Sequence, residues 1–176
     1  FVENYRRLTR IPAPIRTQIS IAELFTDLKK LFPEEEFQFE VPSPELKLNV
    51  DRTQIEQILI NLLKNAREAC SRKSDKKIQV KARKLSAGNT TLTISDNGEG
   101  ILPDVLDKIF VPFFTTKTSG SGIGLSLCKQ IMTLHEGSIN VKSEVGKGSS
   151  FILTILKITS QNYCTKSNKP ENKLHK

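Results

Sequence analysis

Several residue types are scarce in this sequence of 176 residues, which contains no Trp, one Met, three Cys and two His. Three cysteines without paired spacing exclude a disulfide framework and a zinc site, and they indicate a reducing compartment such as the cytoplasm. Two distant histidines, His135 and His175, exclude a histidine-based metal cluster. The sequence also lacks an apolar run of about 18 residues, so we expect no membrane span and no direct membrane contact.

The net charge of +8 lies mostly at the two ends of the chain. Residues 1–16 carry +3 and residues 157–176 carry +4, which leaves +1 for residues 17–156. A nucleic-acid-binding protein concentrates its basic side chains on a folded face. We therefore expect no nucleic-acid partner.

Proline and polar residues suggest where one folded domain begins and ends. Pro12 and Pro14 stop a helix, so residues 1–16 are expected to be a helix end followed by a linker. Residues 17–158 are expected to form the domain, and residues 159–176 a disordered basic tail. The chain begins at Phe1 rather than Met, and we expect it to be a piece of a longer protein.

Hydrophobic periodicity predicts helices and strands in mixed order. Helices are expected over residues 20–31, 51–70 and 124–135, with Ser20 and Asp51 as N-caps. Strands are expected at 37–41, 78–82, 92–94, 139–141 and 151–155. This order favours a two-layer α/β sandwich.

Asn61 and Asn65 lie four residues apart, on one side of the longest predicted helix. A carboxamide at the edge of a core can offer its oxygen to a hard cation such as Mg²⁺. The alternative is two polar side chains on a solvated flank. The residue pattern alone leaves both interpretations open.

Asp96-Asn97-Gly98-Glu99-Gly100 follows a predicted strand directly. An ordinary turn is one interpretation, since Asp, Asn and Gly are typical turn residues. The other is that the Asp96 carboxylate accepts a hydrogen bond from an exocyclic amine such as that of adenine. Gly98 and Gly100 would then let the backbone approach a flat ring.

Gly120-Ser121-Gly122-Ile123-Gly124-Leu125 opens a predicted helix, where bare N–H groups and the helix dipole favour an anion such as phosphate. No Lys-Ser/Thr pair follows, which excludes a P-loop, and no strand precedes it directly, which excludes a Rossmann fingerprint. A flexible connector is the alternative. Lys117, at the end of the aromatic segment 110–117, could reach phosphates or simply be solvated.

The order of these segments resembles the ATP-binding domain of sensor histidine kinases, which shares a superfamily with gyrase, the 90-kilodalton heat-shock chaperone and mismatch-repair ATPases. The matching segments are NLLKNAREA (61–69), DNGEGI (96–101), IFVPFFTTK (109–117), GSGIGLSL (120–127) and GKGSSF (146–151). The resemblance covers about residues 20–156. Residues 1–16 resemble the end of a dimerisation helix and its linker.

This resemblance implies a Bergerat-type two-layer α/β sandwich, with a mixed sheet of about five strands backed by three helices. Residues 98–122 would form an ATP lid. ATP and Mg²⁺ are the implied cofactors, and Asn65 the implied metal ligand. The implied cofactor-binding residues are Asn65, Asp96, Gly98, Gly100, Gly120, Gly122, Gly124, Leu125 and Ser149. The implied catalytic residues are Asn61, Asn65 and Lys117.

The implied activity is transfer of the ATP γ-phosphoryl group to a histidine on a dimerisation domain absent from this chain, with a response regulator downstream. Neither His135 nor His175 has the acceptor context. The ATPase relatives place a Glu base where Asn61 stands, so slow hydrolysis is expected. Glu68 departs from the family, because many of its kinases carry a basic residue there. Alternatives are an anti-sigma-type Ser/Thr kinase and a non-catalytic ATP-binding module.

Overall fold

The computed structural model describes residues 11–40, 43, 45–117 and 120–157. The helix end expected within residues 1–10 and the tail expected at 159–176 lie outside these ranges. Among the helices in the described ranges, none combines the length and the apolar character that crossing a membrane requires.

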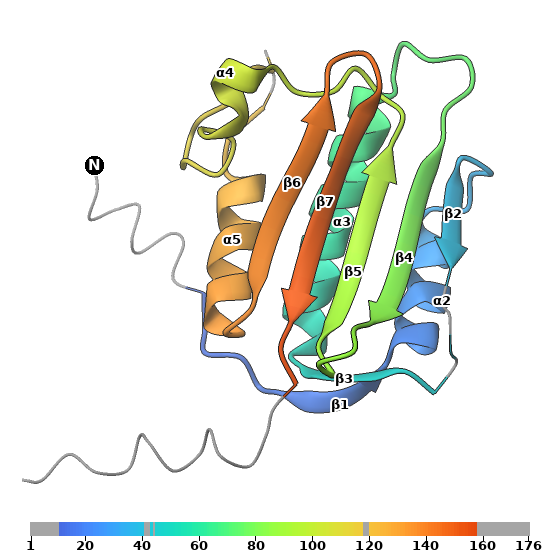
Figure 1. The fold of residues 1–176 in the computed structure, drawn as a ribbon, viewed down its shortest axis with the longest axis vertical. Coiled ribbons are helices and arrows are strands. Elements are labelled where there is room, and N and C mark those ends of the chain that lie inside the picture. The colour runs from blue at the N-terminus through green and yellow to red at the C-terminus, as the bar shows by residue number, and fades with distance from the viewer. Residues whose placement is uncertain (1–10, 41–42, 44, 118–119, 158–176) are drawn as a thin grey trace, which may run out of the picture.

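A five-stranded sheet forms one layer of the molecule, in the order β2-β4-β5-β7-β6 (Figure 1). Its strands are β2 (Phe37–Glu40), β4 (Ile78–Lys84), β5 (Thr90–Asp96), β6 (Ser138–Glu144) and β7 (Gly148–Ile155). β2 pairs with β4 in parallel and the other neighbours are antiparallel. The expected mixed sheet is therefore confirmed. A second, two-stranded sheet of β1 (Thr17–Ser20) and β3 (Lys47–Val50) was not expected from the sequence.

Three helices cover one face of the sheet: α2 (Ile21–Leu31), α3 (Arg52–Ala69) and α5 (Gly124–Leu134) (Figure 1). The Ser20 hydroxyl accepts from the Glu23 amide at 3.4 Å and caps α2. The Asp51 carboxylate accepts from the Gln54 amide at 3.1 Å and caps α3. Both predicted caps are confirmed, and they fix where each helix begins.

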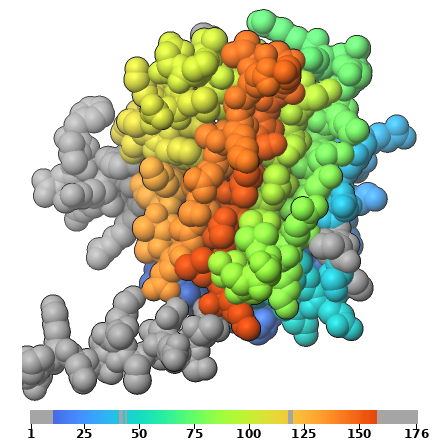
Figure 2. All heavy atoms as spheres, viewed as in Figure 1, coloured from blue at the N-terminus to red at the C-terminus, as the bar shows by residue number. Residues whose placement is uncertain are grey.

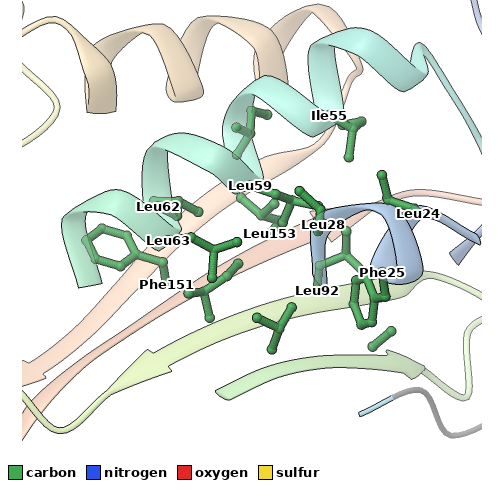
Figure 3. Close-up of a cluster of buried hydrophobic side chains, with 14 of the residues drawn as sticks. Leu24, Phe25, Leu28, Ile55, Leu59, Leu62, Leu63, Leu92, Phe151 and Leu153 are labelled. Carbon is green, nitrogen blue, oxygen red and sulfur yellow. The ribbon is translucent and has the colours of Figure 1, made fainter. Parts of the chain in front are cut away.

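The core lies between the helices and the sheet, and α3 runs through its centre (Figure 3). Leu59, Leu62 and Leu63 of α3 are fully buried against Leu92 of β5 and Leu153 of β7. Burying one such side chain stabilises the fold by about 1.5–3 kcal/mol. This packing fixes the rotation of α3 about its axis, and so fixes the flank that carries its polar side chains.

The segment between β5 and α5 contains the short helix α4 (Pro103–Leu106) and otherwise lacks regular structure in its described part. Figure 2 shows this yellow-green segment beside the orange β6–β7 hairpin. The Ile101 amide donates to Ser143 Oγ at 2.8 Å, and the Gly146 amide donates to the Glu99 carbonyl at 2.8 Å. These two bonds attach the start of the segment to the hairpin.

The described part of the linker lies against the start of α3. Gln54 Nε2 donates to the Pro12 carbonyl at 2.9 Å, and the Ile15 amide donates to Asp51 Oδ2 at 2.9 Å. His135 is buried beside this contact, with its Nε2 accepting from the Asp51 amide at 3.1 Å. His135 therefore has a structural role at the base of the domain.

Candidate nucleotide-binding site

Asn61 and Asn65 occupy the flank of α3 that faces the glycine-rich segment. Asn61 Nδ2 lies 3.9 Å from Cys128 Sγ on α5. Asn65 Oδ1 accepts from Lys117 Nζ at 3.3 Å. The structure thus brings together Asn61, Asn65 and Lys117, which the sequence places on separate segments.

Lys117 also forms an ion pair with the carboxylate that follows Asn65 by one helical turn. The distance from Lys117 Nζ to Glu68 Oε2 is 2.5 Å. Two oxygen atoms of α3 therefore converge on one cation from the segment before α5. Both partners of the ion pair remain partly exposed to solvent, with side-chain exposed fractions of 43% and 60%.

Asp96 is the last residue of β5, and one of its carboxylate oxygens is hydrogen-bonded within the protein. Its Oδ1 accepts from the Gly98 amide at 2.9 Å and from the Ser149 amide at 3.3 Å. Burial raises the pKa of this carboxyl above its ordinary value, and the two amide bonds oppose that rise. Oδ2 has no hydrogen bond within the described part of the chain, so it can accept one from a ligand.

Ser149 lies beside Asp96 on the neighbouring strand, because the two are paired in register. Its hydroxyl is 2.9 Å from the Ser143 hydroxyl of β6. Ser143 Oγ accepts from the Ile101 amide at 2.8 Å and donates to the Gly148 carbonyl at 3.0 Å. The Ser143 proton is thereby used, so the Ser149 hydroxyl donates to Ser143 and keeps its own lone pairs for a ligand.

The two glycines after Asp96, Gly98 and Gly100, are required by close backbone packing, which the sequence did not suggest. A Cβ on Gly98 would lie 2.6 Å from the Ala69 carbonyl oxygen at the end of α3. A Cβ on Gly100 would lie 2.2 Å from the Glu144 carbonyl oxygen. Both positions therefore require close approach between protein backbones, while their approach to a flat ring stays a prediction.

The glycine-rich segment places the bare start of α5 next to Asn61. No side chain caps this helix, and the first intrahelical bond runs from the Leu127 amide to the Ile123 carbonyl. A helix leaves its first N–H groups without intrahelical partners, and here these include Gly124 and Leu125. A Cβ on Gly124 would lie 3.9 Å from Asn61 Cγ, so the two are neighbours. This end of α5 can accept an anion facing α3.

Gly120 and Gly122 hold the aromatic segment against the start of α5. Gly122 has φ +67, and a Cβ there would lie 2.4 Å from the Phe113 carbonyl carbon. The Phe113 amide donates to the Gly122 carbonyl at 2.9 Å. Gly120 lies against Thr115, with 2.5 Å between a built Cβ and the threonine Oγ1. These contacts place Lys117 within reach of α3.

A chain of contacts links Asp96 to the end of α3. Asp96 bonds Gly98, and Gly98 packs on Ala69, which lies one turn beyond Asn65 on α3. A polar hollow of about 300 Å³ includes Asp96 and Ser149 in its lining. Its complete lining is Asp96, Lys142, Ser143, Glu144, Lys147, Gly148, Ser149 and Ser150, so the hollow does not reach Asn61, Asn65, Lys117 or the glycine-rich segment. Within the described ranges, no cluster of three or more His, Cys, Asp or Glu side chains is arranged to bind a metal.

Reasoning from the sequence missed Ser143 and Cys128, and it missed the partner of Glu68. Ser143 faces the same side of β6 as Ile139 and Val141, so strand alternation could have identified it. Glu68 lies three residues after Asn65, on the same side of α3, but its partner comes from a distant loop. Cys128 contacts Asn61, and no sequence signal indicates that contact.

Residues 50–159 match the family described as "Histidine kinase-, DNA gyrase B-, and HSP90-like ATPase". Because the match covers more than half of the chain, the chain belongs to this family, and the resemblance inferred from its motifs is confirmed. Membership of an ATPase family identifies ATP as the nucleotide that such a site takes.

Particular relatives are sensor kinases. The chain is 38% identical over 115 residues to sensor histidine kinase ZraS of Salmonella typhimurium, a match covering 65% of this chain and 24% of the relative. This chain thus spans about a quarter of that relative's length. The catalytic domain of histidine kinase ThkA superposes with a TM-score of 0.70 at 35% identity, covering 80% of this chain and 94% of that chain. ThkA in complex with response regulator TrrA gives 0.69 at 28% identity, covering 88% and 45%. The expected fold class is therefore confirmed.

Proposed function

We propose that this chain is the ATP-binding catalytic domain of a two-component sensor histidine kinase. It transfers the γ-phosphoryl group of ATP to a histidine on a dimerisation domain of the same kinase. The relative and the superposed structures described above are sensor histidine kinases, which supports this function. The chain's share of those relatives corresponds to a domain rather than to a complete kinase.

One observation carries the proposal: Lys117 from the loop meets Asn65 of α3, one turn beyond Asn61, which neighbours the uncapped start of α5. A cation, a carboxamide oxygen and helix N–H groups are the groups that a nucleotide triphosphate needs. Asp96 Oδ2, at the end of β5, is the proposed acceptor for the adenine amine. Ser149, paired with Asp96, supplies a second acceptor beside it.

The residues around Asn65 fit a magnesium ion. Asn65 Oδ1 already accepts from one cation, the Lys117 ammonium, at 3.3 Å. Amide and carboxylate oxygens together with phosphate oxygens are the ligands that Mg²⁺ prefers. Asn65 would hold the ion, which would neutralise charge on the phosphates, while Asn61 would line the triphosphate site from the preceding turn.

The chemistry of the site favours transfer over hydrolysis. Asn61 is an amide and cannot take a proton from water at neutral pH, so the domain lacks the base that an ATPase uses at this position. In the proposed reaction an imidazole nitrogen attacks the γ-phosphorus. A P–N bond forms, the bond to the β,γ-bridging oxygen breaks, and ADP leaves. The role of this chain is to position the phosphates and stabilise their charge.

The proposed partners follow from this reaction. We assign the phosphoacceptor histidine to a dimerisation domain. His135 is buried, bonded to the Asp51 amide at the N-cap of α3 and to the Ile131 carbonyl of α5, and so is not presented to a substrate, while His175 lies outside the described residues. A response regulator is the proposed downstream partner, in line with the complex formed by ThkA and TrrA.

The first test is titration of this chain with ATP in the presence of Mg²⁺ by calorimetry. We expect binding, and we expect Asn65→Ala to weaken it at least tenfold, because the substitution removes one ligand oxygen. Ala favours helix, so α3 should stay folded. Gln57→Ala, an exposed carboxamide on the same helix, is the matched control. No binding by the unmodified chain would contradict the proposal.

The second test supplies a kinase dimerisation domain with this chain and labelled ATP. We expect label on the acceptor that is lost in acid, as phosphohistidine is, and retained in alkali. Acid-stable label would instead identify a Ser/Thr kinase on the same fold. Nucleotide binding without any transfer would identify a regulatory ATP-binding module.

A further inference from the structure

Glu68 is a carboxylate at a place where phosphate is expected. It follows Asn65 by three residues on the same side of α3. A bare negative charge there would repel a triphosphate. In this structure the charge is not bare, because Glu68 Oε2 lies 2.5 Å from Lys117 Nζ.

The ion pair has little value for the stability of the fold. Both side chains are more than a third exposed, and exposed ion pairs contribute little to stability. The Lys117 backbone is already held by Thr115, whose Oγ1 accepts from the Lys117 amide at 3.0 Å. What Glu68 fixes is therefore the position of the ammonium group, 3.3 Å from Asn65 Oδ1.

We propose that Glu68 is a positioning residue that holds the Lys117 ammonium beside Asn65, where it contacts the terminal phosphate of bound ATP. This inference rests on the proposed function. Here the helix carries an acid, which recruits the cation from a loop 49 residues away.

In this proposal Lys117 contacts the γ-phosphate rather than the adenine or the α-phosphate. Lys117 Nζ bonds Asn65, the proposed metal ligand, whereas Asp96 at the adenine end does not contact it. ATP and ADP should therefore respond differently when the ion pair is broken. A merely structural role for Glu68 would change both affinities equally.

The experiment measures ATP and ADP affinities of this chain at saturating Mg²⁺ for four variants. Glu68→Gln and Lys117→Met should each weaken ATP binding about tenfold, the value of one charge-assisted hydrogen bond. ADP binding should stay unchanged. The double variant Glu68→Gln/Lys117→Met should be no weaker than Lys117→Met alone, because Glu68 acts through Lys117. The charge reversal Glu68→Lys/Lys117→Glu should recover ATP affinity, since it restores a cation beside Asn65.

Matched controls break ion pairs elsewhere. Glu56→Gln removes an ion-paired acid of α3 that contacts Arg52, and Lys81→Met removes a lysine of β4 paired with Glu40. Both should leave the affinity for ATP unchanged. Thermal unfolding without nucleotide should place the four variants near the unmodified chain.

Three results would overturn the inference. One is wild-type ATP affinity in Glu68→Gln while the unmodified chain binds ATP, which would leave the proposed function intact. Another is a raised Mg²⁺ requirement in Glu68→Gln but not in Lys117→Met, which would identify Glu68 as a direct metal ligand. The third is no ATP binding by the unmodified chain, which would overturn the proposed function as well.

Discussion

Replacing Asp96 by Asn tests the proposed adenine contact with little change in shape. Asp96 Oδ1 accepts from two backbone amides, at 2.9 and 3.3 Å. The amide oxygen of Asn can take over both of these bonds. Its NH₂ group must then stand where Oδ2 stood, so a donor replaces the free acceptor.

The expected loss of ATP affinity follows from this exchange. A hydrogen bond to a charged group contributes about 1.5–3 kcal/mol, and the substitution also sets a donor against the donating adenine amine. A total of about 3 kcal/mol weakens ATP binding roughly 100-fold. The folded protein should not be destabilised, because burial raises the pKa of Asp96, which means that folding disfavours its charged form. Removing the charge removes that cost.

Inosine triphosphate makes the assay specific for the base. It carries a carbonyl oxygen in place of the adenine amine, and an Asn NH₂ can donate to that oxygen. Calorimetric titration should therefore show the ATP-to-inosine triphosphate preference falling sharply in Asp96→Asn. Asp107→Asn, an exposed acid of the same loop, is the control. An unchanged preference, with circular dichroism showing an intact fold, would refute the assignment of Asp96.

Three further predictions concern groups around the site and beneath it. Gly148 has φ +112, and a Cβ there would lie 1.9 Å from the Asp96 carbonyl oxygen. Gly148→Ala should therefore lower the free energy of unfolding by about 3 kcal/mol or more and lower Tm by roughly 6 °C or more, as measured by circular dichroism. Burial lowers the pKa of His135, whose Nε2 accepts from the Asp51 amide at 3.1 Å. The contribution of neutral His135 to the free energy of unfolding should be complete above the pKa of histidine in the unfolded chain, about 6.5, and should be lost as the pH falls below that value and through the lower pKa of the folded state. Urea unfolding between pH 8 and pH 5 should therefore show a free energy of unfolding that declines with pH, and His135→Gln should reduce that decline. Burial raises the pKa of Cys128 to about 12, so Ellman's reagent at pH 8 should modify this thiol only after unfolding. In a Cys70→Ser/Cys164→Ser variant, which leaves Cys128 as the one thiol of the chain, rapid modification of the native protein would contradict the burial of Cys128.

The main elements of the fold could be predicted because local patterns agreed with the tertiary structure. The apolar stripe of α3 and the alternation of β5 both match the burial that the structure shows. The β1–β3 sheet could not be predicted. Each of its strands has four residues, and their pairing joins Thr17 to Val50 across the whole of α2 and β2. Such short strands take their conformation from a distant partner rather than from their own sequence.

The parts of the site that could be predicted are those whose residue types and local sequence context indicate a binding role. Asp96 and the glycine-rich segment are identifiable by their position after a strand and before a helix. The meeting of Lys117 with Glu68 depends on how the loop folds back over α3, which no local pattern encodes. The link from Ser143 to Ser149 depends on the register of β6 with β7. Contacts set by register and by loop path are therefore the part that the sequence alone did not reveal.

The same geometry bears on why ATP would survive in this site until an acceptor arrives. Water needs a base to attack the γ-phosphate, and Asn61 cannot serve as one. Glu68 is a carboxylate near the proposed metal ligand, but its Oε2 lies 2.5 Å from the Lys117 ammonium, so this oxygen is occupied by the ion pair and is not open to a water molecule. Breaking the pair would free a carboxylate beside Asn65. Lys117→Met should therefore raise the slow ATP hydrolysis of this chain relative to its transfer rate, and adding Glu68→Gln should reverse that rise. Equal hydrolysis in both variants would show that Glu68 has no part in protecting the nucleotide.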